Sequence, residues 1–135
     1  MEISVKKAIK GYPKELRTIG DHIRKRRLDL KLLQVDVARI VKVSTDTITN
    51  WENNRATPMI YQAPKVIKFL QYNPYSFELS ILGAKVKNYR YFHGLSHKKL
   101  GNLVGVNAST VGSWESGKSS PKKKTRENLQ RLKIL

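Results

Sequence analysis

Residues 33–52 read LQVDVARIVKVSTDTITNWE, and residues 96–115 read SHKKLGNLVGVNASTVGSWE. In each stretch apolar residues recur at helical spacing, stop at a short polar turn and then recur again. Each stretch therefore predicts two short helices joined by a turn of three or four residues. Ser44 and Asn107 stand where the second helix begins, and their side chains are typical N-caps.

The two stretches belong to a longer internal repeat. Shifting the sequence so that Tyr12 falls on Tyr75 aligns residues 12–58 with a second copy, without a gap. The identical pairs are Tyr12/Tyr75, Glu15/Glu78, Leu16/Leu79, Gly20/Gly83, Arg27/Arg90, Leu32/Leu95, Val41/Val104, Val43/Val106, Thr47/Thr110, Trp51/Trp114, Glu52/Glu115 and Pro58/Pro121. We expect two domains, residues 1–72 and 73–135, with Asn73-Pro74 as the break between them.

Composition excludes several classes of protein. A chain of 135 residues holds one ordinary domain or two very small ones. The absence of cysteine excludes disulfides, thiolate zinc sites and a cysteine nucleophile. No apolar run approaches the ~18 residues of a membrane helix, and Met1 to Gly11 lacks the apolar core of a signal peptide. These features predict a cytoplasmic protein with no membrane association.

The charge is strongly positive. Lys and Arg total 27 against 10 Asp and Glu, which gives a net charge of +17. Residues 1–63 carry 13 basic and 7 acidic residues, a net +6, and residues 64–135 carry 14 and 3, a net +11. Such a chain attracts polyanions, and nucleic acid is the first candidate.

The motif of the first copy consists of Gln34, Val37-Ala38, Val43-Ser44, Ile48, Trp51-Glu52 and Pro58. It resembles the motif of the lambda-repressor-like, Xre and Cro type helix-turn-helix family, and the second copy repeats it. The resemblance implies an all-α fold, built as two tandem helix-turn-helix domains of four to five short helices each. It also implies sequence-specific binding of double-stranded DNA by a bacterial transcriptional regulator acting at the nucleoid.

The same resemblance implies which residues contact DNA. The base-facing candidates are Thr45, Asp46, Thr47, Thr49 and Asn50 in the first copy and Ala108, Ser109, Thr110 and Ser113 in the second. Asparagine pairs with adenine through two hydrogen bonds, and aspartate accepts one from cytosine. The phosphate-contact candidates are Gln34, Asn53, Arg55, His97, Lys118, Lys122, Lys123 and Lys124.

The second copy departs from the family pattern. Gly101 replaces alanine in its first motif helix, His97 replaces glutamine, and Gly112 lies inside its recognition helix. Two hypotheses therefore stay open. Both copies read different half-sites of an asymmetric target, or the second copy grips the backbone while the first selects the sequence.

Several residues allow a structural and a functional interpretation. Trp51 and Trp114 are interpreted as core residues rather than base-stacking platforms. The family resemblance makes Arg27 with Glu52, and Arg90 with Glu115, structural ion pairs rather than a phosphate contact and a catalytic acid. Thr47 and Thr110 suit a helix-start or backbone-contact role as well as base reading.

Other clusters of basic residues and histidines also have a structural interpretation beside a functional one. The run Arg24–Arg27 is typical of a solvated helix face. Lys6, Lys7 and Lys10 suit a minor-groove arm or an unstructured extension. His93 and His97 have a metal-binding spacing but no evident third ligand, so we expect no metal site.

No catalytic motif is present, and we expect neither an enzyme nor a cofactor. The leading hypothesis is a DNA-binding regulator, most simply a repressor. The alternative is an antitoxin-type protein-interaction module of the same fold. Binding to RNA or to a membrane surface is a third and weaker interpretation. Duplex DNA is the expected partner, and a homodimer or a protein partner stays open.

Overall fold

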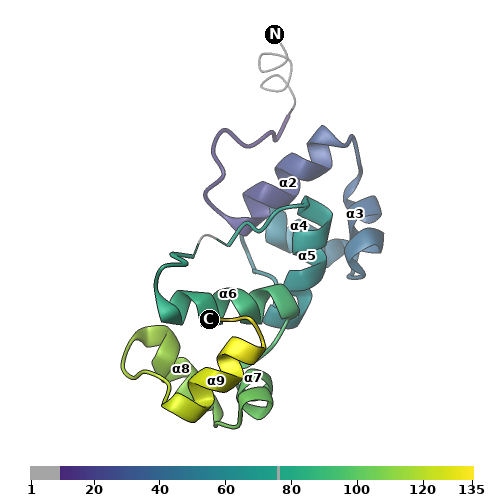
Figure 1. Cartoon of the computed structure of the whole chain (residues 1–135). Helices are drawn as coiled ribbons and strands as arrows, with labels where there is room; N and C mark the ends of the chain where they lie inside the picture. The colour runs from purple at the N-terminus through teal and green to yellow at the C-terminus, as the bar shows by residue number, and fades with distance from the viewer. Residues whose placement is uncertain (1–9, 76) are drawn as a thin grey trace. The chain divides into compact units, whose positions relative to one another are not determined.

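The computed structural model describes residues 10–75 and 77–135, and all regular elements in these ranges are helices (Figure 1). The predicted all-α class is therefore confirmed. The chain groups into two compact units: the first contains residues up to Pro58 together with Lys65–Pro74, and the second contains Met59–Pro64 and Tyr75–Leu135. The sequence placed the domain boundary between residues 72 and 73. That boundary leaves Met59–Pro64 in the first domain, whereas the structure groups this segment with the second unit.

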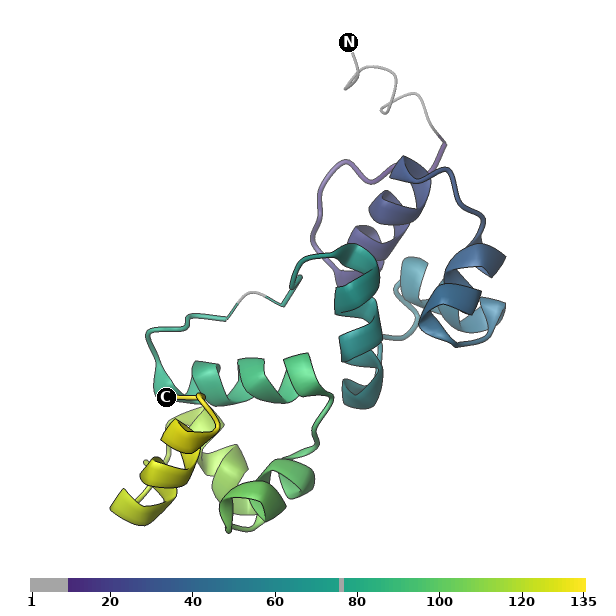
Figure 2. The same ribbon diagram turned by 45° about the vertical axis from the view of Figure 1, so that its right-hand side comes forward.

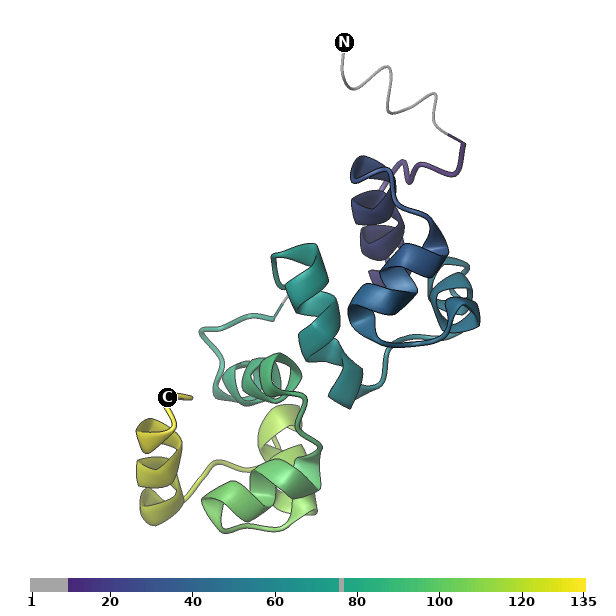
Figure 3. The same cartoon turned by 90° about the vertical axis from the view of Figure 1, so that its right-hand side faces the viewer.

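The first unit is built around the helical pair quoted at the outset. Its helices are α2 (Ile19–Asp29), α3 (Gln34–Val41), α4 (Thr45–Glu52) and α5 (Ala63–Leu70). The short 3-10 helix η1 (Ile60–Gln62) before α5 lies in the segment that groups with the second unit. Figure 3 shows the short turn that leads from α3 into α4. The buried core residues are Ile23, Val37, Ala38, Val41, Ile48, Trp51, Val66, Phe69 and Leu70. Every helix of the unit thus contributes to one core.

The second unit repeats this construction. Its helices are α6 (Leu82–His93), α7 (His97–Val104), α8 (Ala108–Ser116) and α9 (Lys123–Arg131). Figure 2 shows α6 running across the other three helices of its unit. The buried core residues are Val86, Leu100, Val104, Val111, Trp114, Leu129 and Ile134. Trp51 and Trp114 each expose only 2% of their surface, so the prediction that they are core residues is confirmed.

A glycine lets α2 approach α4 in the first unit, and another lets the corresponding helix α6 (Leu82–His93) approach α8 (Ala108–Ser116) in the second. A Cβ on Gly20 would lie 1.9 Å from the carbonyl oxygen of Trp51, and a Cβ on Gly83 would lie 2.5 Å from that of Trp114. Both contacts are far inside van der Waals distance, so no side chain fits at either position. This close approach explains why the repeat has glycine at both positions.

Candidate nucleic-acid interface

The turn between α3 and α4 is held by local hydrogen bonds. The Ser44 hydroxyl accepts from the Thr47 N–H at 3.1 Å, and Asn107 accepts from the Thr110 N–H at 2.8 Å in the second unit. The prediction that Ser44 and Asn107 are N-caps is therefore confirmed. The C-cap of α3 is Lys42, whose φ is 59°, and the C-cap of α7 is Gly105, whose φ is 83°. These left-handed residues set the direction in which the second helix begins.

Helix α4 divides into a buried and an outward face. Ile48, Trp51 and Glu52 are buried at helical spacing, while Thr45 and Asp46 are exposed. The other base-contact candidates of this helix, Thr47, Thr49 and Asn50, are half-buried. The outward face of α4 is therefore polar, and its first turn carries a carboxylate.

Two candidate contact residues on different helices bond to each other. The Thr49 hydroxyl donates to Gln34 Oε1 at 2.8 Å, and Gln34 Nε2 donates to Glu52 Oε1 at 3.2 Å. Gln34 at the start of α3 is thereby joined to the middle and the end of α4. Its side chain has a defined orientation before any ligand arrives.

A buried carboxylate holds the carboxyl end of α4. The Glu52 side chain is fully buried and receives Arg27 through two hydrogen bonds, Nε to Oε2 at 2.7 Å and Nη2 to Oε1 at 2.9 Å. Arg24 adds a third bond to Oε1 at 3.3 Å. Arg27 also donates to the Leu32 carbonyl at 3.1 Å. One carboxylate thus joins α2, α3 and α4.

Sequence reasoning did not identify the role of Arg24. Besides Glu52 Oε1, its Nη2 donates to the Glu52 carbonyl at 3.1 Å and to Asn53 Oδ1 at 3.0 Å. Lys25 pairs with Asp29 at 2.7 Å, and Arg26 donates to the Phe69 carbonyl at 3.2 Å. The run Arg24–Arg27 is therefore an ion-pair and hydrogen-bond network and not merely a solvated face. One sequence signal could have identified the role of Arg24. Arg24 and Arg27 are spaced i, i+3, which puts both on one helix face.

The second unit has the same ion pair with a different third member. Arg90 bonds to both oxygens of Glu115, with Nη2 to Oε1 at 2.8 Å, and donates to the Leu95 carbonyl at 3.1 Å. His97 Nε2 lies 3.2 Å from Glu115 Oε1, as Gln34 does from Glu52. The counterpart of Arg24 is Lys87, whose amine lies 5.6 Å from the centre of the Phe77 ring.

Helix α8 presents short side chains. Val111 and Trp114 face the core, Ser109 is exposed, and Ala108, Thr110 and Ser113 are half-buried. The hydroxyls of Ser109 and Thr110 both donate to Asn107 Oδ1 at 2.8 Å, so they take part in the helix cap. Thr47 takes part in the cap of α4 in the same way, with its hydroxyl 2.8 Å from that of Ser44. These contacts favour the helix-start role for both threonines.

Six of the eight candidate phosphate-contact residues lie at exposed positions after α4 and α8, whereas Gln34 and His97 are half-buried and begin α3 and α7. Asn53 and Arg55 follow α4, and Lys118 follows α8. Lys122 is the N-cap of α9, and Lys123 and Lys124 form its first turn, which contains no acidic residue and no side-chain cap. Cations at a helix N-terminus are unfavourable, because the N–H groups there already carry positive partial charge. This end of α9 is therefore electrostatically suited to an anion.

The suggested N-terminal arm lies mostly outside the described residues. Lys6 and Lys7 of the suggested N-terminal arm lie outside the described residues, and Lys10 is exposed. Within residues 10–75 and 77–135, no group of three His, Cys, Asp or Glu side chains is placed to hold a metal ion. Within the same residues no helix is both long enough and apolar enough to span a membrane.

Comparison with known families agrees with this geometry. Residues 23–77 match the family model described as "Helix-turn-helix". Comparison of the chain with curated proteins and with solved structures found no match. The matched segment contains α2 to α5, the turn before α4 and the buried Arg27–Glu52 pair. This part of the chain is therefore similar to helix-turn-helix domains of the lambda-repressor-like type, and the similarity supports DNA binding.

Proposed function

We propose that this protein binds double-stranded DNA sequence-specifically and represses transcription from an asymmetric operator, with α4 and α8 as two different recognition helices. The observation that carries the proposal is the polar outward face of α4. This face begins with Asp46, includes Asn50 and is fixed from behind by the buried Glu52. A short helix with such a face matches the width of the DNA major groove.

The chemistry of α4 suits direct reading of bases. The amide of Asn50 both donates and accepts, so it pairs with adenine, and the exposed carboxylate of Asp46 accepts from the amino group of cytosine. Thr45 and Thr49 offer a methyl group and a hydroxyl beside them. The bond from Thr49 to Gln34 supports a second role for Gln34, in which its remaining amide N–H reaches a phosphate at the start of α3.

Helix α8 offers a different set of groups. Ser109 and Ser113 provide hydroxyls, and Ala108 provides a methyl group that suits thymine. A Cβ on Gly112 would have no atom within 4 Å, so the fold leaves that position open for a close approach of the duplex. Because the two helices carry different residues at nearly every outward position, with Thr47 and Thr110 as the shared pair, they are expected to prefer different sequences. The target is then asymmetric.

Basic residues around the recognition helices provide affinity. Arg55 and Lys118 follow the two helices, and Lys122–Lys124 surround the N-terminus of α9. A phosphate at this helix end would offset the repulsion between the three lysines and the helix dipole. Binding at a promoter would exclude RNA polymerase, which makes repression the simplest regulatory outcome. The site of action is then the nucleoid in a bacterial cytoplasm.

The assigned roles are tested by comparing Asn50→Ala with Lys123→Gln, which changes a cation on α9. Fluorescence anisotropy would measure the affinity of each variant for a selected duplex and for single-base variants of that duplex. Asn50→Ala should lower discrimination at one base pair by about 1–3 kcal/mol, while Lys123→Gln should weaken all duplexes alike. Equal patterns for the two variants would contradict the assignment.

A protein-interaction function of the antitoxin type is the second candidate. It is favoured by Leu33 and Ile40 on the first unit, which expose 67% and 51% of their surface. Under this candidate an acidic partner, co-expressed from a neighbouring gene, co-purifies with the unsubstituted chain. It is lost from the Leu33→Ser, Ile40→Ser double variant, whose DNA affinity is unchanged. Retention of the partner by the double variant would count against it.

A further inference from the structure

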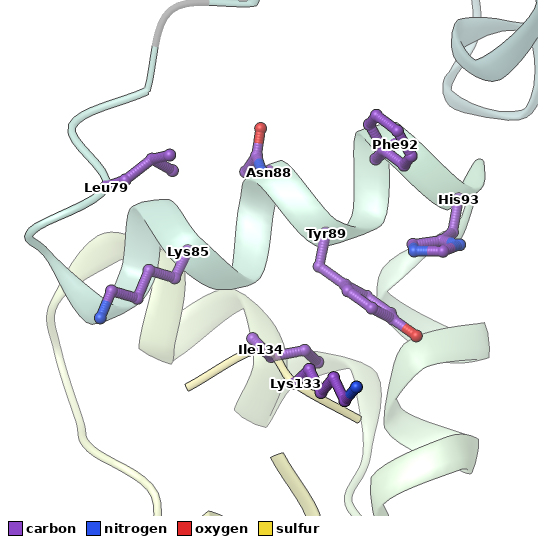
Figure 4. A pocket seen from close by; sticks show the side chains of 8 residues that line it. All are labelled: Leu79, Lys85, Asn88, Tyr89, Phe92, His93, Lys133 and Ile134. Carbon is purple, nitrogen blue, oxygen red and sulfur yellow. The ribbon is translucent and has the colours of Figure 1, made fainter. Parts of the chain in front are cut away.

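The second unit contains a pocket outside the recognition helices. It has a volume of about 420 Å³ and lies along α6. Its lining residues are Leu79, Lys85, Asn88, Tyr89, Phe92, His93, Lys133 and Ile134, all shown in Figure 4. Such a volume is typical of sites for small organic molecules.

The lining combines an apolar wall with cations. Leu79, Phe92 and Ile134 are apolar, and the Tyr89 and His93 rings lie 4.1 Å apart between centroids. Lys85 and Lys133 provide two ammonium groups, and no carboxylate lines the pocket. A ligand that fits this lining has an apolar body and a negative charge.

The position of the polar groups indicates where that charge would lie. In Figure 4 the Tyr89 hydroxyl and the Lys133 amine both extend toward the His93 end of the pocket, while the Lys85 amine extends toward the opposite end. An acidic group at the His93 end would therefore meet an ammonium group and a phenol O–H. Phe92 exposes 53% of its surface and Leu79 exposes 50%, so a planar ring would cover apolar area that now faces water.

The first unit serves as an internal comparison, because the same helix face is filled there. The repeat pairs Lys85 with His22 and Tyr89 with Arg26. His22 Nδ1 lies 2.6 Å from the Tyr72 hydroxyl, and Arg26 Nε donates to the Phe69 carbonyl. Phe92 has an acidic counterpart, Asp29, which pairs with Lys25 at 2.7 Å. The fold therefore does not require this helix face to be aromatic and free of acidic residues. Such a face is found on α6 of the second unit and not on α2 of the first.

We propose that this pocket of the second unit binds a small aromatic acid, with its ring against Phe92, Leu79 and Ile134 and its anionic group at Lys133. The proposal does not depend on the protein binding DNA. Ligand binding by the pocket is measured without DNA, so a negative result would not contradict DNA binding, and a failure to bind DNA would not contradict ligand binding.

The test compares two dyes that share one ring system, using the full chain. Anilinonaphthalenesulfonate carries the negative charge, and N-phenylnaphthylamine lacks it. Fluorescence titration should give saturable binding of one sulfonate per chain, about tenfold tighter than binding of the uncharged dye. Lys133→Gln should remove this preference for the anion, and Phe92→Ala should weaken both dyes.

Lys98→Gln is the matched control, because it removes one exposed lysine of the same unit that neither lines the pocket nor is assigned a phosphate contact. It should leave both affinities unchanged. Thermal unfolding of each variant verifies that the fold is retained, so that weaker binding reports the pocket. The proposal is overturned by the absence of saturable binding, by equal affinity for the two dyes, or by equal losses in Lys98→Gln and Lys133→Gln.

Discussion

Glu52 is the residue on which the orientation of α4 most depends. Its carboxylate is buried and receives hydrogen bonds from Arg27, Arg24 and Gln34, so three segments of the first unit meet at one charge. A buried charge with these partners is satisfied, but removal of the carboxylate charge would leave two guanidinium groups without their counter-ion.

Glu52→Gln should therefore destabilise the first unit by about 3 kcal/mol. The measurement is urea unfolding followed by Trp51 fluorescence in a Trp114→Phe background, in which only the first unit contains a tryptophan. Asp46→Asn, an exposed carboxylate on the same helix, is the control, and about 0.5 kcal/mol or less is expected for it. An equally small effect of Glu52→Gln would show that the buried ion pair does not hold α4.

His22 gives the first unit a pH dependence of known sign. Burial lowers the pKa of His22, and the nearby Lys25 charge adds to this, against the opposing effect of Asp21. The unfolded chain then takes up the proton first, so the contribution of His22 to stability is complete above the ordinary pKa of about 6.5 and is lost as the pH falls from there through the lower pKa of the folded state. The stability difference between the parent and His22→Asn should shrink between pH 8 and pH 5. A difference that does not change with pH would contradict this assignment.

At the scale of elements, the two units differ in the residue that ends the helix before the turn, α3 in the first unit and α7 in the second. The turn needs a left-handed residue, which is Lys42 in the first unit and Gly105 in the second. A residue with a Cβ pays for this conformation, and glycine does not.

Lys42→Gly should therefore stabilise the first unit by about 1 kcal/mol, and Gly105→Lys should destabilise the second by a similar amount. A Cβ on Gly105 would meet no atom within 4 Å, so the reverse substitution tests the backbone conformation alone. Urea unfolding of single-tryptophan variants, one per unit, measures both changes. A loss of stability in Lys42→Gly would refute the explanation.

Helix boundaries of the motif were predictable from sequence because they depend on local chemistry. Ser44 and Asn107 cap their helices through bonds that span three residues. The roles of the glycines were not predictable, because they depend on residues distant in sequence. Gly101, a departure from the family pattern, lies where a Cβ would come within 2.5 Å of the Val106 carbonyl oxygen. Closer packing of that turn explains the departure without reference to DNA.

In the candidate site, too, contacts between residues distant in sequence were predictable only where the repeat marked them. The ion pairs of Glu52 and Glu115 recur at one spacing in both copies, so the repeat itself pointed to them. Arg24 has Lys87 as its counterpart, and no repeated pattern marked its contacts with Glu52 and Asn53. The pocket along α6 also lacked a signal, because its lining joins Leu79, one face of α6 and residues near Ile134, which only the fold brings together.

At the scale of the whole molecule, the net charge of +17 predicts strong salt dependence of DNA binding. Contacts to six to ten phosphates would lower the affinity by about 10³–10⁵ between 50 and 200 mM salt. Anisotropy titrations at four or five salt concentrations give the slope. A slope near zero would be incompatible with binding through the phosphate backbone.

Selection of bound duplexes from a random library by the full chain tests the central claim most directly. The proposed pair of unlike recognition helices predicts one enriched site with two different half-sequences, and Asn50→Ala should relax only one of them. A palindromic site, or no enrichment above random sequence, would contradict the proposal that α4 and α8 read one asymmetric operator.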